Sequence, residues 1–257
     1  GAQPGAIMAM VRPLRTRVAR IRQIQRETPW ASFARYRPPA AIRLLRHGGW
    51  HTIDYAREWL RERLQDAGLP EDATFEQAYR HTGHTLYVGA TRYYRPRASG
   101  PRAEPFVFSH EHTPQAKVAE AVVASMAVPL FWPPVQVDGW WYCDGGVAMN
   151  HPLSIFAKLP PEQVFGARVD TGEEILLDTG EAELDPVRPG IAAIISANAS
   201  MLRAVANRSH VPDELWARIV RINVGEEQAL DFAAREERMY ALRMAGATAL
   251  AAWIATP

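Results

Sequence analysis

The chain has 257 residues, of which 47% are hydrophobic and 22% charged, and its net charge is +1. This composition is typical of a folded globular protein and excludes a disordered or strongly charged chain, and the length suffices for one sizeable core. Because no run of about 18 apolar residues is present, we expect no segment to span a membrane. The single cysteine, Cys143, excludes an intrachain disulfide and fits a reducing compartment, so we expect a cytoplasmic protein.

The first nine residues read Gly-Ala-Gln-Pro-Gly-Ala-Ile-Met-Ala. Their pattern is similar to that of a nucleophile elbow, G-x-S-x-G, running into its helix. Gly1 and Gly5 stand at the two glycine positions, while Gln3 stands where the serine is expected. The question is whether this segment is an elbow without its nucleophile or a chance likeness.

Residues 1–50 are strongly basic, with ten arginines and a single acid, Glu27. Apolar residues from Ile7 to Ile24 recur every three or four positions, which predicts a helix with one apolar stripe and a basic flank. Two interpretations stay open: a core-packed helix with a solvated basic face, or an arginine face over residues 11–46 that makes peripheral contact with an anionic membrane surface. A transit peptide is disfavoured because the pattern continues into globular sequence.

Further along the chain, helical patterns alternate with short β-rich runs, which indicates an α/β layered domain. Helices are expected within residues 5–80, with a break at Pro38-Pro39, and over residues 114–126 and 229–254. Strands are expected at residues 85–90, 105–109, 174–177 and 217–224.

Two local signals predict structure in more detail. Thr74, with Gln77 three residues later, has the pattern of a capping box at the start of a helix. Asp138-Gly139, between apolar runs, predicts a hairpin with a type I′ turn. In the second hairpin strand Cys143 and Asp144 are neighbours, so their side chains should face opposite sides, and we expect Cys143 to be a buried small hydrophobe.

Residues 124–153, ASMAVPLFWPPVQVDGWWYCDGGVAMNHPL, resemble the patatin-like phospholipase family, whose members carry A-S-x-A-(I/V)-P, F-P-P-V and D-G-G/A motifs. Asp144, Gly145 and Gly146 stand at the D-G-G/A motif. Residues 74–91 and 237–250 are similar to further family segments, so the resemblance covers nearly the whole chain. It implies a single three-layer α/β domain over residues 1–257, with helices on both faces of a mostly parallel central sheet. The chain is expected to lack the family's first strand and its glycine-rich oxyanion loop.

The family resemblance implies a catalytic dyad of the elbow serine and the motif aspartate, and hence Asp144 as a catalytic residue with Gln3 at the nucleophile position. Glutamine has no hydroxyl to attack an acyl carbon. Pro4 follows it, and proline lacks the backbone N–H that the residue after an elbow nucleophile often lends to the oxyanion. The resemblance therefore implies a lipid acyl hydrolase homologue that is inactive or impaired. The alternative is a non-catalytic protein that binds acyl lipid or a protein partner.

Other interpretations of single residues are weaker. In D-G-G, Asp144 alone is also compatible with an aspartate that only binds turn amides. The pairs His81/His84 and His110/His112 have no converging third ligand, so no metal or other cofactor is expected. Trp140-Trp141 is compatible with an acyl pocket, although one aromatic on each side of a hairpin is the simpler interpretation. No glycine-rich phosphate loop is present, and the basic segment lacks interleaved aromatics, which disfavours nucleotides and nucleic acids. The sequence leaves the oligomeric state open.

Overall fold

The computed structural model describes residues 14–34, 40–97, 100–170, 210–225 and 236–255. The elbow-like segment at residues 1–9 and the strand expected at residues 174–177 lie outside the described residues. The chain divides into two compact units. Unit 1 comprises residues 1–150 with 205–207, and unit 2 comprises residues 151–204 with 208–257.

Unit 1 contains the described helices of the first half of the chain. They are α2 (Leu14–Glu27), α3 (Ala40–His47), α4 (Asp54–Asp66), α5 (Phe75–Thr82) and α6 (Val118–Met126), with short 3-10 helices η1 (Trp30–Ala34) and η2 (Gly145–Val147). Helix α5 begins as the sequence predicts. The hydroxyl of Thr74 accepts from the backbone N–H of Gln77 at 3.2 Å, and the side-chain oxygen of Gln77 accepts from the N–H of Thr74 at 2.9 Å. The capping box is therefore confirmed.

The four-stranded sheet of unit 1 has the order β2-β1-β4-β3. Its strands are β1 (Val88–Tyr94), β2 (Arg102–Phe108), β3 (Val135–Val137) and β4 (Trp140–Asp144). All three strand pairs are antiparallel. The mostly parallel sheet expected from the sequence is therefore not confirmed here. Short connections join β1 to β2 and β3 to β4, and a strand pair joined by a short turn must run antiparallel.

The turn between β3 and β4 is the predicted hairpin turn. Asp138 has a φ of 48° and Gly139 a φ of 82°, so both central residues are left-handed, as a type I′ turn requires. The predicted hairpin is confirmed. It sets the register of β4, which leads directly to Asp144.

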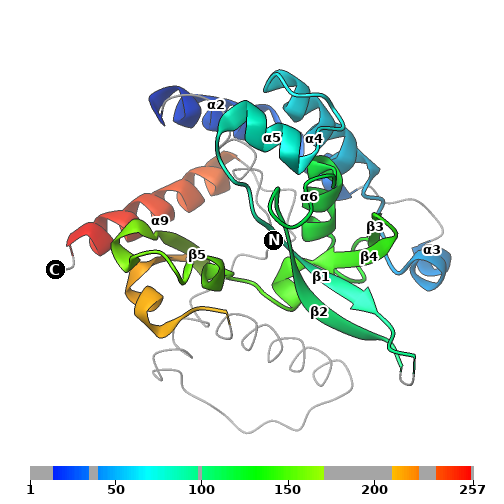
Figure 1. The fold of residues 1–257 in the computed structure, drawn as a ribbon. Helices are drawn as coiled ribbons and strands as arrows, with labels where there is room; N and C mark the ends of the chain where they lie inside the picture. The colour runs from blue at the N-terminus through cyan, green and yellow to red at the C-terminus, as the bar shows by residue number, and fades with distance from the viewer. Residues whose placement is uncertain (1–13, 35–39, 98–99, 171–209, 226–235, 256–257) are drawn as a thin grey trace, which may run out of the picture. The chain divides into compact units, whose positions relative to one another are not determined.

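Helix α6 packs against β1, β3 and β4 and forms the centre of unit 1 (Figure 1). Its side chains are buried nearly all round. This explains its composition of alanine and valine, since a helix that is covered on every side needs no polar face. Glu120 is its one charged residue, and it pairs with Arg57 and Arg61 of α4 at 3.0 and 3.1 Å.

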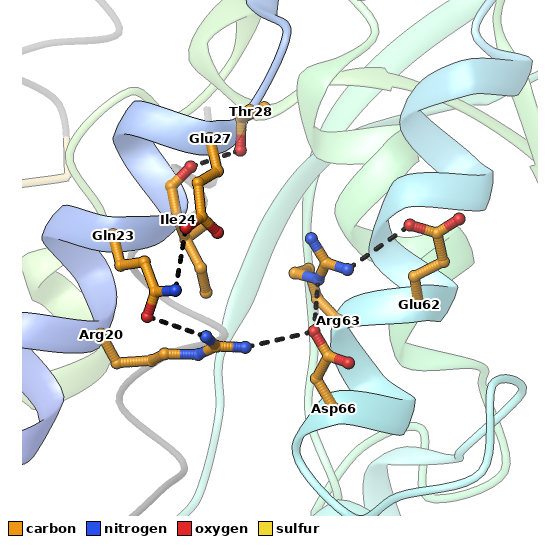
Figure 2. Close-up of polar contacts among 8 residues, drawn as sticks. All are labelled: Arg20, Gln23, Ile24, Glu27, Thr28, Glu62, Arg63 and Asp66. Atoms are coloured by element: carbon orange, nitrogen blue, oxygen red, sulfur yellow. Dashed lines mark hydrogen bonds and ion pairs between the residues drawn. The ribbon is translucent and has the colours of Figure 1, made fainter.

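Helix α2 lies beside α4, as Figure 2 shows. The Nη2 atom of Arg20 lies 3.4 Å from Oδ2 of Asp66, the same oxygen that Arg63 reaches through Nε at 3.0 Å. Ile24, on the apolar stripe, is buried, and the hydroxyl of Thr28 donates to its carbonyl at the end of the helix. The described part of α2 thus supports the interpretation of a core-packed helix with a basic outer face.

Unit 2 contains a parallel strand pair, β5 (Gly166–Asp170) and β6 (Ile219–Asn223), with helix α9 (Glu236–Ala255) packed against β6. Three short 3-10 helices complete it: η3 (Leu153–Phe156), η4 (Pro161–Gln163) and η5 (Asp213–Arg218). A small apolar core is made of Leu153, Val164, Val211, Leu215 and Ile219. None of the helices in the described ranges, α9 included, has both the length and the hydropathy to cross a bilayer.

Candidate functional site

Asp144 is the last residue of β4, and its backbone is anchored from two sides. Its N–H donates to the carbonyl of Ala127, which follows α6, at 2.9 Å. Its own carbonyl accepts from the hydroxyl of Thr91 in β1 at 2.8 Å, and Thr91 is fully buried. The sheet and the end of α6 therefore fix the point from which the Asp144 side chain extends.

The carboxylate of Asp144 is also oriented. Oδ1 accepts a hydrogen bond from the backbone N–H of Gly146 at 2.6 Å and so caps the short helix η2. Asp144 is 9% exposed. Among the residues that the structure describes, no hydrogen bond reaches the other carboxylate oxygen, Oδ2. A nearly buried carboxylate with one oxygen held and one acceptor available suits a proton-accepting or orienting role.

The two glycines of the Asp144-Gly145-Gly146 motif are each required for a different steric reason. A Cβ on Gly145 would lie 2.4 Å from the carbonyl oxygen of Gly89 in β1, so only glycine fits against that strand. A Cβ on Gly146 would lie 2.8 Å from Oδ1 of Asp144 and 2.8 Å from Oδ1 of Asn150. Each glycine permits a close approach that holds the Asp144 turn in place.

Cys143 is buried on β4, as the sequence predicts. In a strand its side chain points to the face opposite that of Asp144. Burial raises the pKa of the Cys143 thiol to about 11. Because the thiolate is the nucleophilic form, this environment makes Cys143 a poor substitute for the missing serine.

The tryptophan pair of the hairpin does not enter the core. Trp140 and Trp141 are each about half exposed, and the guanidinium of Arg92 lies 4.7 Å from the ring centroid of Trp140. Trp141 borders a cavity of about 290 Å³ that is also lined by Arg43 and Arg57. These half-exposed rings fit the interpretation of one aromatic on each side of the hairpin better than that of an enclosed acyl pocket.

The histidine pairs occupy ordinary surface and packing positions. His110 stacks on Tyr79 with ring centroids 3.8 Å apart, and His81 and His84 are exposed near the end of α5. Within the described ranges, no three His, Cys, Asp or Glu side chains are grouped so that they can hold a metal ion.

A charged cluster in unit 2 is missing from the sequence predictions. Asp170 is fully buried at the end of β5, where it pairs with Arg168 at 2.6 Å and with Arg221 of β6 at 2.8 Å. Burial, and then the charge of Arg168, lowers the pKa of the nearby His151. The signal was the Arg-x-Asp alternation at residues 168–170, which places both side chains on one face of a strand.

Two comparisons with known proteins bear on the family of the chain. The family model described as patatin-like phospholipase matches residues 1–157. A protein of Invertebrate iridescent virus 6, described as "Probable lipid hydrolase 463L", is 23% identical over 111 residues, which cover 43% of this chain. The chain spans about a third (36%) of the length of that viral protein. The family match includes all of β1 to β4 and the Asp144-Gly145-Gly146 turn, and it extends over more than half of the 257 residues. The chain therefore belongs to the patatin-like phospholipase family.

Proposed function

We propose that this protein is a homologue of the lipid acyl hydrolases of its family, phospholipases and carboxylic ester hydrolases of the Ser–Asp dyad type. In this proposal Asp144 keeps the acid position of the dyad and Gln3 occupies the serine position. The proposal treats residues 1–257 as one patatin-like domain that acts on, or derives from proteins that act on, lipid or other acyl esters. The observation that supports it most is the Asp144 turn, where a nearly buried carboxylate is held by the Gly146 amide at the end of a strand.

The chemistry of residues 3 and 4 makes this homologue inactive or impaired in ester hydrolysis. A carboxamide at Gln3 supplies neither the nucleophilic oxygen nor the proton that Asp144 would accept. Pro4 has no N–H to donate to an oxyanion, and loss of one such donor costs about 10²–10³ in rate. These two residues favour the second candidate function, binding of an acyl lipid or a protein partner without catalysis.

Labelling with a fluorophosphonate probe tests the dyad separately from turnover. An activated serine oxygen attacks the phosphorus and displaces fluoride, which leaves a stable covalent adduct. We expect no labelling of the natural chain and labelling at residue 3 in the variant Gln3→Ser/Pro4→Ala. Adding Asp144→Asn should remove that labelling, whereas Asp138→Asn, in the exposed hairpin turn, should not. Labelling of the natural chain at another serine would contradict the proposal, since the nucleophile would then lie elsewhere.

A further inference from the structure

Helix α3 exposes side chains that a helix of a folded domain normally buries. Leu45 is 86% exposed and Ile42 is 49% exposed. The two residues are three positions apart and therefore share one face of the helix. Leu44, on another side of the helix, is partly buried, whereas Ile42 and Leu45 form an exposed aliphatic face.

Two more exposed apolar residues, Trp50 just after this helix and Leu130 much further along the chain, lie side by side. Trp50 is 49% and Leu130 62% exposed, and the N–H of Trp50 donates to the carbonyl of Leu130 at 3.0 Å. Leu130 has a φ of 69°, a left-handed conformation that is costly for a residue with a bulky side chain. A Cβ on Gly49 would lie 2.3 Å from the Trp132–Pro133 peptide, so the two segments are pressed together. Leu130 is thus both strained in its backbone and exposed in its side chain.

Ile42, Leu45, Trp50 and Leu130 are here called the apolar patch, and the segment around α3 that carries three of them is basic. Arg46 is exposed on α3, and Arg43 is partly exposed at a cavity that Asp54 and Arg57 also line. Asp54 pairs with Arg57 at 3.2 Å, and no ion pair of Arg43 or Arg46 is found among the described residues. No Asp or Glu occurs in residues 40–53 or 128–137, the two segments that carry the patch. In α2, by contrast, Arg20 is already paired with Asp66.

We propose that the apolar patch, with Arg43 and Arg46, is a docking surface for membranes that contain anionic lipids. Exposed aliphatic and tryptophan side chains enter the interfacial layer of a bilayer, where tryptophan is favoured. Arginines next to them bind lipid phosphates and are attracted by the negative surface potential. The choice of a lipid occupant rests on the proposed function, while the exposure and charge of the patch do not. This proposed surface, on α3 and the adjoining loops, is narrower than the arginine face over residues 11–46 that was expected from the sequence.

Vesicle binding by the full chain tests this surface without any need for catalysis. We expect binding to phosphatidylcholine vesicles that hold about 30% phosphatidylserine, and much weaker binding to pure phosphatidylcholine or at high salt. Arg43→Gln/Arg46→Gln should weaken binding about twenty-five-fold, at about five-fold for each arginine. The matched control Arg22→Gln/Arg26→Gln removes two exposed charges from α2, outside the patch, and should change binding by less than about five-fold.

The apolar part of the surface has its own test. Ile42→Gln/Leu45→Gln should weaken binding about ten-fold or more. Leu45→Gln alone should also weaken binding and leave the thermal midpoint unchanged, because Leu45 is 86% exposed. Lipids with acyl chains brominated near the headgroup should quench the tryptophan fluorescence of the natural chain more than that of a Trp50→Phe variant.

Equal binding to neutral and anionic vesicles, or equal losses of binding in the α2 and α3 arginine variants, would overturn the proposal. So would absence of vesicle binding together with a self-association that Ile42→Gln/Leu45→Gln abolishes, since the patch would then join two copies of the chain. Failure of the fluorophosphonate test alone would leave vesicle binding intact, so the two proposals fail separately.

Discussion

The carboxylate of Asp144 accepts a 2.6 Å hydrogen bond from the backbone N–H of Gly146, two residues further along the chain. A Cβ at residue 146 would lie 2.8 Å from this carboxylate oxygen, so a side chain there would have to displace it. The orientation of the Asp144 carboxylate therefore depends on the absence of a side chain at residue 146.

We predict that Gly146→Ala destabilises the protein by about 1–3 kcal/mol, because its Cβ would displace the Asp144 carboxylate from its hydrogen bond in a nearly buried site. Urea unfolding of unit 1 measures this change through tryptophan fluorescence. Gly100→Ala is the control: no atom lies within 4 Å of its added Cβ, so its effect should stay within about 0.5 kcal/mol. Equal stability of the two variants would show that residue 146 has room for a side chain.

The buried pairing of Asp170 with Arg168 and Arg221 predicts a large effect of its removal. Asp170→Asn should destabilise unit 2 by about 3–5 kcal/mol, because it leaves arginine charge uncompensated in a buried site. Asp66→Asn breaks the exposed pairs with Arg20 and Arg63 and should cost no more than about 1 kcal/mol. Thermal unfolding of both variants gives the comparison, and a loss for Asp170→Asn as small as that for Asp66→Asn would argue against a structural role of the cluster.

Cys143 predicts a loss of stability at high pH. Burial raises its pKa in the folded state to about 11, whereas an unfolded cysteine titrates near 8.5. The folded state therefore favours the neutral thiol: this contribution is complete below about pH 8.5 and is lost as the pH rises to about 11. Cys143→Ala should lose less stability than the natural chain over this range, as denaturant unfolding at several pH values will show. Burial also raises the pKa of Tyr93, so the variant should keep part of the loss. Identical pH profiles would contradict the assignment to Cys143.

Local signals predicted local structure well. Thr74 with Gln77, and Asp138 with Gly139, each determine a turn or cap through bonds within a few residues, and both were confirmed. The mostly parallel arrangement of the sheet was not confirmed: strand partners such as Ala90 and Asp144 are distant in sequence and meet only after the chain between them has folded. The same reason hides the exposure of Leu45, whose helical pattern alone gives no indication of which face is covered.

In the candidate site, too, local features were predicted from the sequence and contacts between distant residues were not. The family motif located Asp144, Gly145 and Gly146 by their spacing, and the steric demand on each glycine became visible only with Gly89 and Asn150 in place. The Asp170 cluster joins residues 51 positions apart, so no local pattern in the chain connects Asp170 to Arg221.

The most direct test of the central claim is hydrolysis of p-nitrophenyl butyrate by the Gln3→Ser variant of the 257-residue chain. We predict little or no hydrolysis, because the serine oxygen would return while Pro4 still offers no N–H to the oxyanion, whose stabilisation is usually the largest contribution to catalysis. Gln3→Ser/Pro4→Ala should exceed the single variant, and Asp144→Asn should abolish whatever activity appears in either. Turnover by Gln3→Ser alone at an ordinary esterase rate, about 10 per second, would contradict this account.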